Sequence, residues 1–221
     1  NFTKMIDSEL LEYLQGFLTP RRKKLFEKVI EQRTNHFTVV AQDVYQLHNT
    51  SAVIRSCDVF GVQNLQIIEE KLPQRIDKEI AMGAQKWVNV NRFNSTKKCL
   101  TAMRDKGYKI VATSPHYDST RLQDLDITEP CAIFFGTEKD GLSNEVLDYA
   151  DTTLHIPMFG FTESLNISVS AAIILQHLTD RLRKSDVKWE LCAKEKQELT
   201  YLWTTKSIKN SKELIERFCS T

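Results

Sequence analysis

Residues 154–176 read LHIPMFGFTESLNISVSAAIILQ, which gives a strand, a loop and a helix in one short segment. The strand covers residues 152–156 and ends at Pro157, and the loop turns on Gly160. Residues 164–166 (Ser-Leu-Asn) open a helix that is apolar on nearly every side and must therefore be buried. The backbone N–H groups of its first turn point into the space that the loop encloses, which favours a ligand site. The alternative is a capped core helix, because Ser and Asn are ordinary N-cap residues.

A second strand-to-helix segment lies nearer the start of the chain. Residues 37–41 are β-branched and short enough for a buried strand, and a polar loop over residues 43–48 follows. The pattern is helical over residues 49–60, with Gly61 as the C-cap, and residues 65–68 form the next strand. This order makes a βαβ unit, which predicts a parallel α/β sheet.

Asn49 and Arg55 are six residues apart at the start of that predicted helix. They do not share a helical face unless Asn49 lies outside, at the cap, and Arg55 reaches back. This arrangement is unusual for an arginine with a purely structural role. The structural alternative is a surface arginine paired with a neighbour such as Asp58.

A third segment follows the buried strand at residues 131–135 and reads GTEKDGLS over residues 136–143. Its glycines have the spacing of a phosphate loop, but Leu142 stands where a Walker lysine must meet the phosphates, which excludes a nucleotide hydrolase. Ser143 is expected to cap a short helix that ends near residue 150. A further strand at residues 108–113 ends at the same edge of the sheet.

Taken together and in order, these segments resemble the three motifs of the SpoU/TrmH branch of the SPOUT class, which are RNA ribose 2′-O-methyltransferases. The motifs read HNTSAVIRSCD over residues 48–58, FGTEKDG over residues 135–141 and SLN over residues 164–166. The resemblance runs from about Arg21 to Lys184. It implies an open parallel sheet with helices on both faces and a C-terminal deep trefoil knot, flanked by N- and C-terminal helices.

The resemblance also implies the cofactor and the site. The cofactor is S-adenosylmethionine, held by backbone groups of the knot loops, and the active unit is a homodimer with the site near its interface. The implied cofactor-binding residues are Thr113, Gly136, Glu138, Gly141, Ile156, Met158, Ser164, Leu165 and Asn166. The implied catalytic residues are Arg55, Asn49, Glu138, Ser164 and Asn166, and no metal is expected.

Family mechanisms give the arginine that matches Arg55 the part of general base. A guanidinium has a pKa above ~12 and rarely gives up a proton in proteins. We therefore expect Arg55 to grip the adjacent RNA phosphate and to stabilise the developing alkoxide, while Asn49 holds Arg55 or the ribose and Glu138 supports its loop.

Basic residues mark the candidate RNA-binding segments. Thr19-Pro20 reads as a helix start, and the helix then carries Arg21, Arg22, Lys23 and Lys24. A run of cations is usually only a solvated face, but next to an RNA methylase core a phosphate-binding arm is the better interpretation. Lys86, in the loop at residues 81–87, is a further RNA-binding candidate. The expected domains are a basic arm (1–35), the SPOUT domain (36–184) and a C-terminal helical extension (185–221).

Composition limits the classes of protein that fit. The 221 residues carry a formal charge of +1, so any nucleic-acid surface must be a local patch. The five cysteines are scattered without a Cys-x-x-Cys pair, which argues against a disulfide framework or a zinc site and favours a reduced cytosol. We expect no membrane span and no signal peptide, because no apolar run is long enough.

Within the family, the chain looks most like the subgroup that methylates the D-loop guanosine at position 18 of tRNA. The basic helix before the core, the Lys86 loop and the C-terminal helices fit that subgroup. One alternative is the same chemistry on rRNA, although such relatives commonly carry a separate N-terminal RNA-binding domain. The other alternative is a non-catalytic RNA-binding member of the fold.

Overall fold

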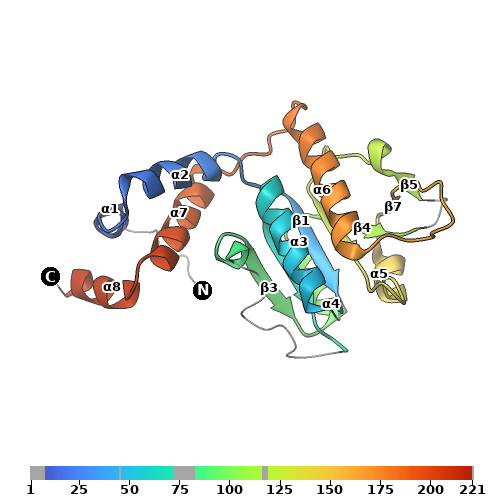
Figure 1. Cartoon of the computed structure of the whole chain (residues 1–221), viewed down its shortest axis with the longest axis horizontal. Coiled ribbons are helices and arrows are strands. Elements are labelled where there is room, and N and C mark those ends of the chain that lie inside the picture. Colours follow the sequence, from blue (N-terminus) through green and yellow to red (C-terminus); the bar gives the residue numbers. More distant parts are fainter. Residues whose placement is uncertain (1–7, 45, 72–82, 116–118, 221) are drawn as a thin grey trace. The chain divides into compact units, whose positions relative to one another are not determined.

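The computed structural model describes residues 8–44, 46–71, 83–115 and 119–220. The chain divides into two compact units (Figure 1). One joins the two ends of the chain, residues 1–33 and 190–221, and the other is residues 34–189. Residues 1–33 of the predicted arm and 190–221 of the predicted extension thus fall in one unit, whereas residues 34–35 and 185–189 fall in the larger one. None of the helices in the described part of the chain is long and apolar enough to cross a membrane.

The larger unit is built on one parallel sheet. Its strands, within the described residues, are β1 (Thr34–Gln42), β2 (Val62–Ile68), β3 (Asn89–Phe93), β4 (Lys109–Thr113), β5 (Thr120–Arg121), β6 (Cys131–Phe135) and β7 (Thr152–His155). They lie in the order β3-β2-β1-β6-β4-β7-β5, and every neighbouring pair is parallel. The predicted open parallel sheet is confirmed.

Helices cover both faces of this sheet. Helices α3 (Leu47–Phe60) and α6 (Ile167–Arg183) pack on one face, and α4 (Thr96–Asp105) and α5 (Asn144–Tyr149) pack on the other. Successive strand residues supply the two cores in turn, so Ile133 faces α3 and α6 while Phe134 faces α4 and α5. Because both faces are covered, β6 is buried and apolar along its whole length, and β1 is buried from Phe37 to Gln42, with Thr38 and Gln42 as its polar members.

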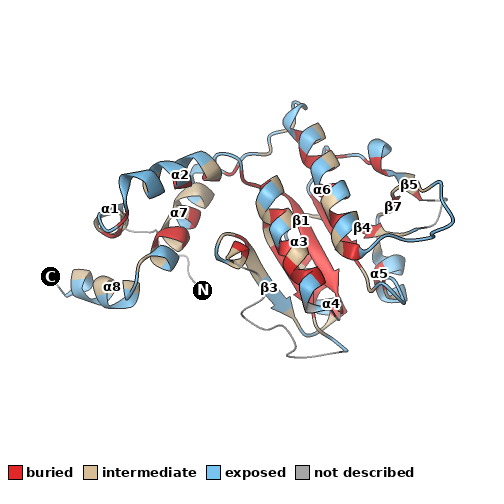
Figure 2. Cartoon of the chain, viewed as in Figure 1, coloured by how far each residue is buried: buried red, intermediate tan, exposed pale blue. Residues whose placement is uncertain are grey.

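Helix α6 is less buried than the sequence predicts. Its inner side, which includes Ala171 and Leu175, is fully buried, but Val169 is 45% exposed and Ile173 is 38% exposed. Figure 2 shows buried and exposed stretches alternating along α6. The expectation that this helix is buried on every side is wrong for a single chain. Within the described residues, the sheet and α3 cover the inner stripe, and an apolar outer stripe stays exposed.

The smaller unit is helical. Its helices are α1 (Ser8–Gln15), α2 (Pro20–Ile30), α7 (Ala193–Ser207) and α8 (Ser211–Cys219). Thr19 caps α2 as predicted, since its hydroxyl accepts a hydrogen bond from the Arg22 N–H and Pro20 is the first helical residue. Trp203 of α7 is buried against Phe26, with ring centroids 5.5 Å apart.

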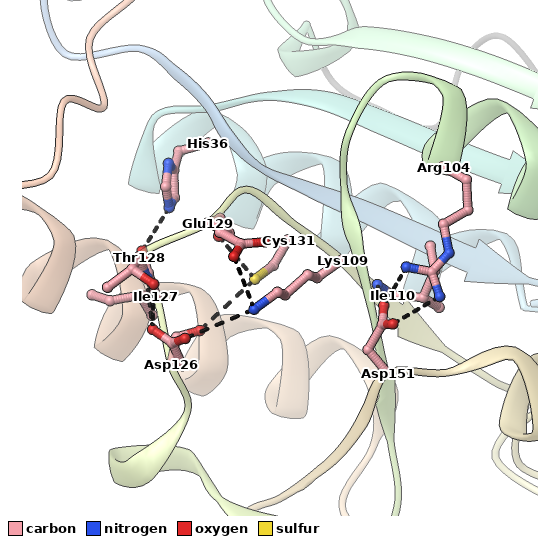
Figure 3. A network of polar contacts seen from close by, with 10 residues as sticks. All are labelled: His36, Arg104, Lys109, Ile110, Asp126, Ile127, Thr128, Glu129, Cys131 and Asp151. Carbon is pink, nitrogen blue, oxygen red and sulfur yellow. Dashed lines mark hydrogen bonds and ion pairs between the residues drawn. The ribbon is translucent and has the colours of Figure 1, made fainter.

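Charged side chains at the amino-terminal edge of the sheet are paired (Figure 3). Asp151 accepts two hydrogen bonds from Arg104, at 2.6 and 2.8 Å, and one from the backbone N–H of Ile110 at 2.7 Å. Lys109 lies 3.3 Å from Glu129. Burial would raise the pKa of Asp151, but the bonds from Arg104 and Ile110 outweigh it and hold the pKa below its ordinary value.

Candidate functional site

A cavity of about 390 Å³ lies at the carboxyl-terminal edge of the sheet. Its walls come from the segments that follow β4, β6 and β7, which are neighbours in the sheet, and from the loop that leads into α6. Ligands of open α/β sheets bind at this edge, where the strands end. Eight of the nine predicted cofactor-binding residues line the cavity: Thr113, Gly136, Glu138, Gly141, Ile156, Met158, Ser164 and Leu165.

The second motif forms a tight hairpin over residues 136–141, which we call the glycine hairpin. The Thr137 N–H donates to the Gly141 carbonyl at 3.0 Å, and the Gly141 N–H donates to the Thr137 carbonyl at 3.1 Å. A Cβ on Gly136 would lie 2.1 Å from the Gly141 carbonyl carbon, and Gly141 itself has a φ of 69°. The closure therefore requires glycine at both positions, which brings backbone groups to the cavity wall.

Asn49, Glu138 and Asn166 join the three motifs by hydrogen bonds. Glu138 Oε1 accepts from Asn49 Nδ2 at 2.9 Å and from Asn166 Nδ2 at 2.5 Å. Asn166 Nδ2 also lies 3.1 Å from Asn49 Oδ1, and Asn49 is buried. Although Asn166 does not line the cavity, it is tied to Glu138, which does.

The structure corrects the position expected for Asn49. Helix α3 begins at Leu47, so Asn49 lies inside its first turn and Gln46 is the cap. The helix starts earlier than expected because the Gln46 carbonyl already accepts a hydrogen bond from the Asn49 N–H. The Gln46 side chain makes no cap bond, so the sequence pattern did not indicate this start. Asn49 therefore holds Glu138 and Asn166 rather than Arg55.

Arg55 lies on α3 as an exposed residue and does not line the cavity. Among the described residues its guanidinium forms no ion pair with a carboxylate. The alternative that Arg55 has a structural role, as the ion-pair partner of Asp58, is therefore not supported. A single chain thus brings Ser164 to the cavity and links Glu138 to Asn49 and Asn166, but leaves Arg55 apart from them.

Asn166 also caps α6, as expected for a residue at the start of that helix. Its Oδ1 accepts a hydrogen bond from the Ser168 backbone N–H at 2.8 Å, while its Nδ2 donates a hydrogen bond to Glu138. One amide group therefore fixes both the helix start and the position of the glycine hairpin. Ser164 and Leu165 are exposed and precede the helix. The loop that leads from β7 to α6 is largely exposed (Figure 2).

The sequence reasoning missed several residues at this edge. Gln42, at the end of β1, is buried, and its Nε2 donates to Thr96 and Ser143 at 2.9 and 2.8 Å. The Ser143 hydroxyl therefore bonds Gln42 and makes no cap bond for α5, although Ser143 does stand at the cap position. Gln42 could have been found from the sequence, because it is a polar residue at the end of an apolar strand. Glu163, next to the third motif, also lines the cavity.

The predicted RNA-binding cations lie on α2 and on the short helix η1 (Ala84–Lys86). Arg21, Arg22 and Lys24 are exposed, and Lys23 is half-buried. Four consecutive helical residues point in four directions, so they cannot all face one strand of RNA. Lys86 is exposed, while residues 81 and 82 of its predicted loop lie outside the described residues. In the part of the chain that the structure describes, no three His, Cys, Asp or Glu residues gather to hold a metal ion.

Comparisons with known proteins agree with the geometry. The model of the SpoU rRNA Methylase family matches residues 36–176. The chain is 40% identical to a tRNA (guanosine(18)-2′-O)-methyltransferase of Borreliella burgdorferi, over 89% of this chain and 90% of that protein. It is 31% identical to the Escherichia coli K12 protein of the same name, over 72% of this chain and 69% of that protein.

Two solved structures show the same fold. The A. aeolicus TrmH/SpoU tRNA modifying enzyme has a TM-score of 0.75 and 31% identity, over 86% of this chain and 98% of that one. The SpoU methyltransferase AviRb of Streptomyces viridochromogenes, in complex with AdoMet, has a TM-score of 0.60 and 27% identity, over 72% and 62% of the two chains.

Proposed function

The chain belongs to the SpoU rRNA methylase family, and from this premise we propose that it methylates the ribose 2′-hydroxyl of the guanosine at position 18 of tRNA. The observation that carries the proposal is the joining of all three motifs, through Asn49, Glu138 and Asn166, beside one cavity. The relatives that bear this activity in their names cover most of the chain.

The cavity fits S-adenosylmethionine. Its volume lies within the ~300–1,000 Å³ of small-molecule sites, and its wall combines apolar side chains such as Leu154 and Ile174 with the backbone of the glycine hairpin. The eight cofactor residues predicted at its wall, together with Asn166 behind Glu138, would hold the molecule. When bound, the cofactor supplies a methyl group already activated by the sulfonium charge.

The protein must then orient the ribose and assist the loss of its proton. A 2′-hydroxyl is a poor nucleophile until that proton leaves. Arg55 is exposed and available to an RNA phosphate, and its fork of N–H donors would stabilise the developing alkoxide. Asn49 acts through Glu138 and Asn166, so we assign it a positioning role.

We propose a homodimer formed through the exposed apolar surface of the larger unit. This apolar surface consists of Phe159, Phe161, Leu165, Val169 and Ile173. Its two phenylalanines are fully exposed, and it runs from the rim of the cavity along the outer face of α6, beside α3. A second copy over this surface would bury it and would bring the partner subunit's Arg55 toward the cavity.

The proposed knot concerns the segment after β7. That strand lies between β4 and β5, yet the chain returns from it to place α6 beside α3 on the face above β1 and β6. The return path forms the loop that lines the cavity, which supports a threaded arrangement in which one segment closes the fold and builds the cofactor site.

The proposed tRNA contact on the smaller unit is narrower than the four consecutive cations. Arg21, Lys24 and Lys28 recur at i, i+3 and i+7 and are exposed, so they form one basic stripe on α2. Replacing the three with Ala should weaken tRNA binding nearly equally for all tRNA sequences and flatten its salt dependence. An unchanged salt slope would contradict the contact.

The experiment for the whole proposal is a methylation assay with ribose mapping. The protein is incubated with S-adenosylmethionine and with tRNA or rRNA, and 2′-O-methylated nucleosides are located by mass spectrometry. Methylation confined to guanosine 18 of tRNA is the expected result. Methylation of rRNA alone would favour the rRNA alternative, and binding of RNA without methylation would favour a non-catalytic member of the fold.

A further inference from the structure

The cavity that would hold the cofactor carries an excess of negative charge. Among the described residues, its charged lining residues are Glu138, Lys139, Asp140 and Glu163, which give a formal charge of −2. Lys139 and Asp140 are adjacent at the tip of the glycine hairpin, so their fields largely cancel at a distance. Two carboxylates, Glu138 and Glu163, therefore set the sign of the potential in the cavity.

These two carboxylates differ in what they contact. Glu138 accepts hydrogen bonds from Asn49 and Asn166, so its position is fixed and its charge is partly satisfied by protein donors. Glu163 stands in the loop between β7 and α6, beside Ser164. Within the described part of the chain it forms no ion pair or hydrogen bond. Its carboxylate is therefore available to the occupant of the cavity.

Methyl transfer changes the charge of that occupant. The bond between the methyl carbon and sulfur breaks and its electron pair stays on sulfur, so the sulfonium becomes a neutral thioether. The methyl carbon forms a bond to the ribose oxygen, and the hydroxyl proton passes to solvent water. S-adenosylmethionine has a net charge of +1, whereas the product S-adenosylhomocysteine has none.

We propose that Glu163 makes the cavity discriminate S-adenosylmethionine from S-adenosylhomocysteine by charge. This inference rests on the proposed function. A negative cavity attracts the cation in preference to the neutral product, because the potential acts on net charge even without a direct contact. Glu163 is then a residue that sets specificity, and it favours release of the spent cofactor after each transfer.

The test measures the binding of both molecules to the full-length protein by calorimetry. We expect Glu163→Gln to weaken the binding of S-adenosylmethionine about two- to fivefold, as for loss of one solvent-exposed charge interaction. The affinity for S-adenosylhomocysteine should stay unchanged. The preference of the wild type for the substrate over the product should also shrink as salt is added. Glu129→Gln is the matched control, because it removes an exposed carboxylate at the opposite edge of the sheet.

The outcomes separate the possibilities. Equal weakening of both molecules would overturn the inference, because it would indicate a contact with the α-ammonium group that substrate and product share. No change in either molecule, with the wild type still binding both, would overturn it and leave the proposed function intact. Failure of the wild type to bind either would count against the proposed function itself. A thermal melt of each variant confirms that the fold is retained.

Discussion

The two edges of one sheet differ in how far their charged groups are satisfied by the protein itself. At the amino-terminal edge, the carboxylate of Asp151 is satisfied by Arg104 and a backbone N–H, and Lys109 lies between Asp126 and Glu129 (Figure 3). At the carboxyl-terminal edge, Glu163 and the loop around it are exposed. Polar groups that find their partners within the chain stabilise the fold, whereas exposed polar groups beside a cavity are available to a ligand.

The difference begins in the backbone. The glycine hairpin closes so tightly that Gly136 has no space for a side chain, and the loop after β7 extends for eleven residues before α6 begins at Ile167. At the amino-terminal edge, by contrast, a three-residue turn leads from α4 into β4, with hydrogen bonds from the Gly107 and Tyr108 N–H groups to the carbonyls of Arg104 and Met103. We therefore expect substitutions at the carboxyl-terminal edge to change function more than stability, and those at the other edge to do the reverse.

The largest expected effect is that of Arg55→Ala. Turnover should fall by a factor on the order of 10² or more, as on loss of one preorganised donor, while the affinity for S-adenosylmethionine stays close to that of the wild type. Single-turnover methyl transfer and calorimetry measure the two quantities. Arg55→Lys keeps the charge but loses the fork of donors, so it should restore only part of the rate.

A mixing experiment sharpens the same prediction. If Arg55 acts on the partner's cavity, inactive Arg55→Ala subunits mixed with inactive Gly136→Ala subunits should regain part of the activity, since one cavity of the mixed dimer has all its parts. Near wild-type turnover in Arg55→Ala alone would remove Arg55 from the chemistry.

The sequence predicted the edge of the sheet that carries the site, but not the partners there. The strand at residues 131–135 and the left-handed C-cap at Gly61 follow from local patterns, and the structure has both as expected. The bond between Asn49 and Glu138 depends on β1 and β6 being neighbours although 89 residues separate the pair. A single sequence contains no local signal for such a pairing.

The outer face of α6 shows a second limit of the sequence. Apolar residues such as Val169 and Ile173 indicate that something covers this face, and local pattern alone suggested the protein's own core. In the described part of the chain the sheet lies beneath the helix, and the outer face of the helix stays exposed in the single chain. A pattern predicts burial, but it does not name the surface that provides it.

Gly136→Ala should have the next largest effect. The added methyl group would lie 2.1 Å from the Gly141 carbonyl carbon, so the glycine hairpin must open. We expect at least ~10-fold weaker binding of S-adenosylmethionine and a loss of roughly 1–3 kcal/mol of stability, as in an overpacked core. Gly160→Ala is the control, because the nearest atom to its Cβ would be 4.0 Å away. Calorimetry that finds equal affinities for the two variants would contradict a role for the closed hairpin.

Asn166 separates the capping role from the positioning role. Asn166→Ala removes the cap of α6 and the hydrogen-bond donor to Glu138. It should cost about 1 kcal/mol of stability and weaken the binding of S-adenosylmethionine about fivefold. Asn166→Ser keeps a capping oxygen but not the donor, so stability should return while affinity stays low. Recovery of both in the Ser variant would show that Asn166 acts on the cofactor only through the helix start.

The smallest effect is expected at the amino-terminal edge, where Asp151→Asn removes a charge but keeps the shape. The pKa of Asp151 is lowered in the folded state, so its contribution to stability is present above its unfolded pKa of ~3.9 and is lost as pH falls through the folded value. The side chain is partly exposed, so we expect the variant to be about 1 kcal/mol less stable at pH 7 in urea unfolding, with the difference shrinking below about pH 4. Affinity for S-adenosylmethionine and turnover should not change, because the ion pair lies at the far end of the strands from the cavity. A fall in cofactor affinity without a change in stability would mean that the two edges are not independent.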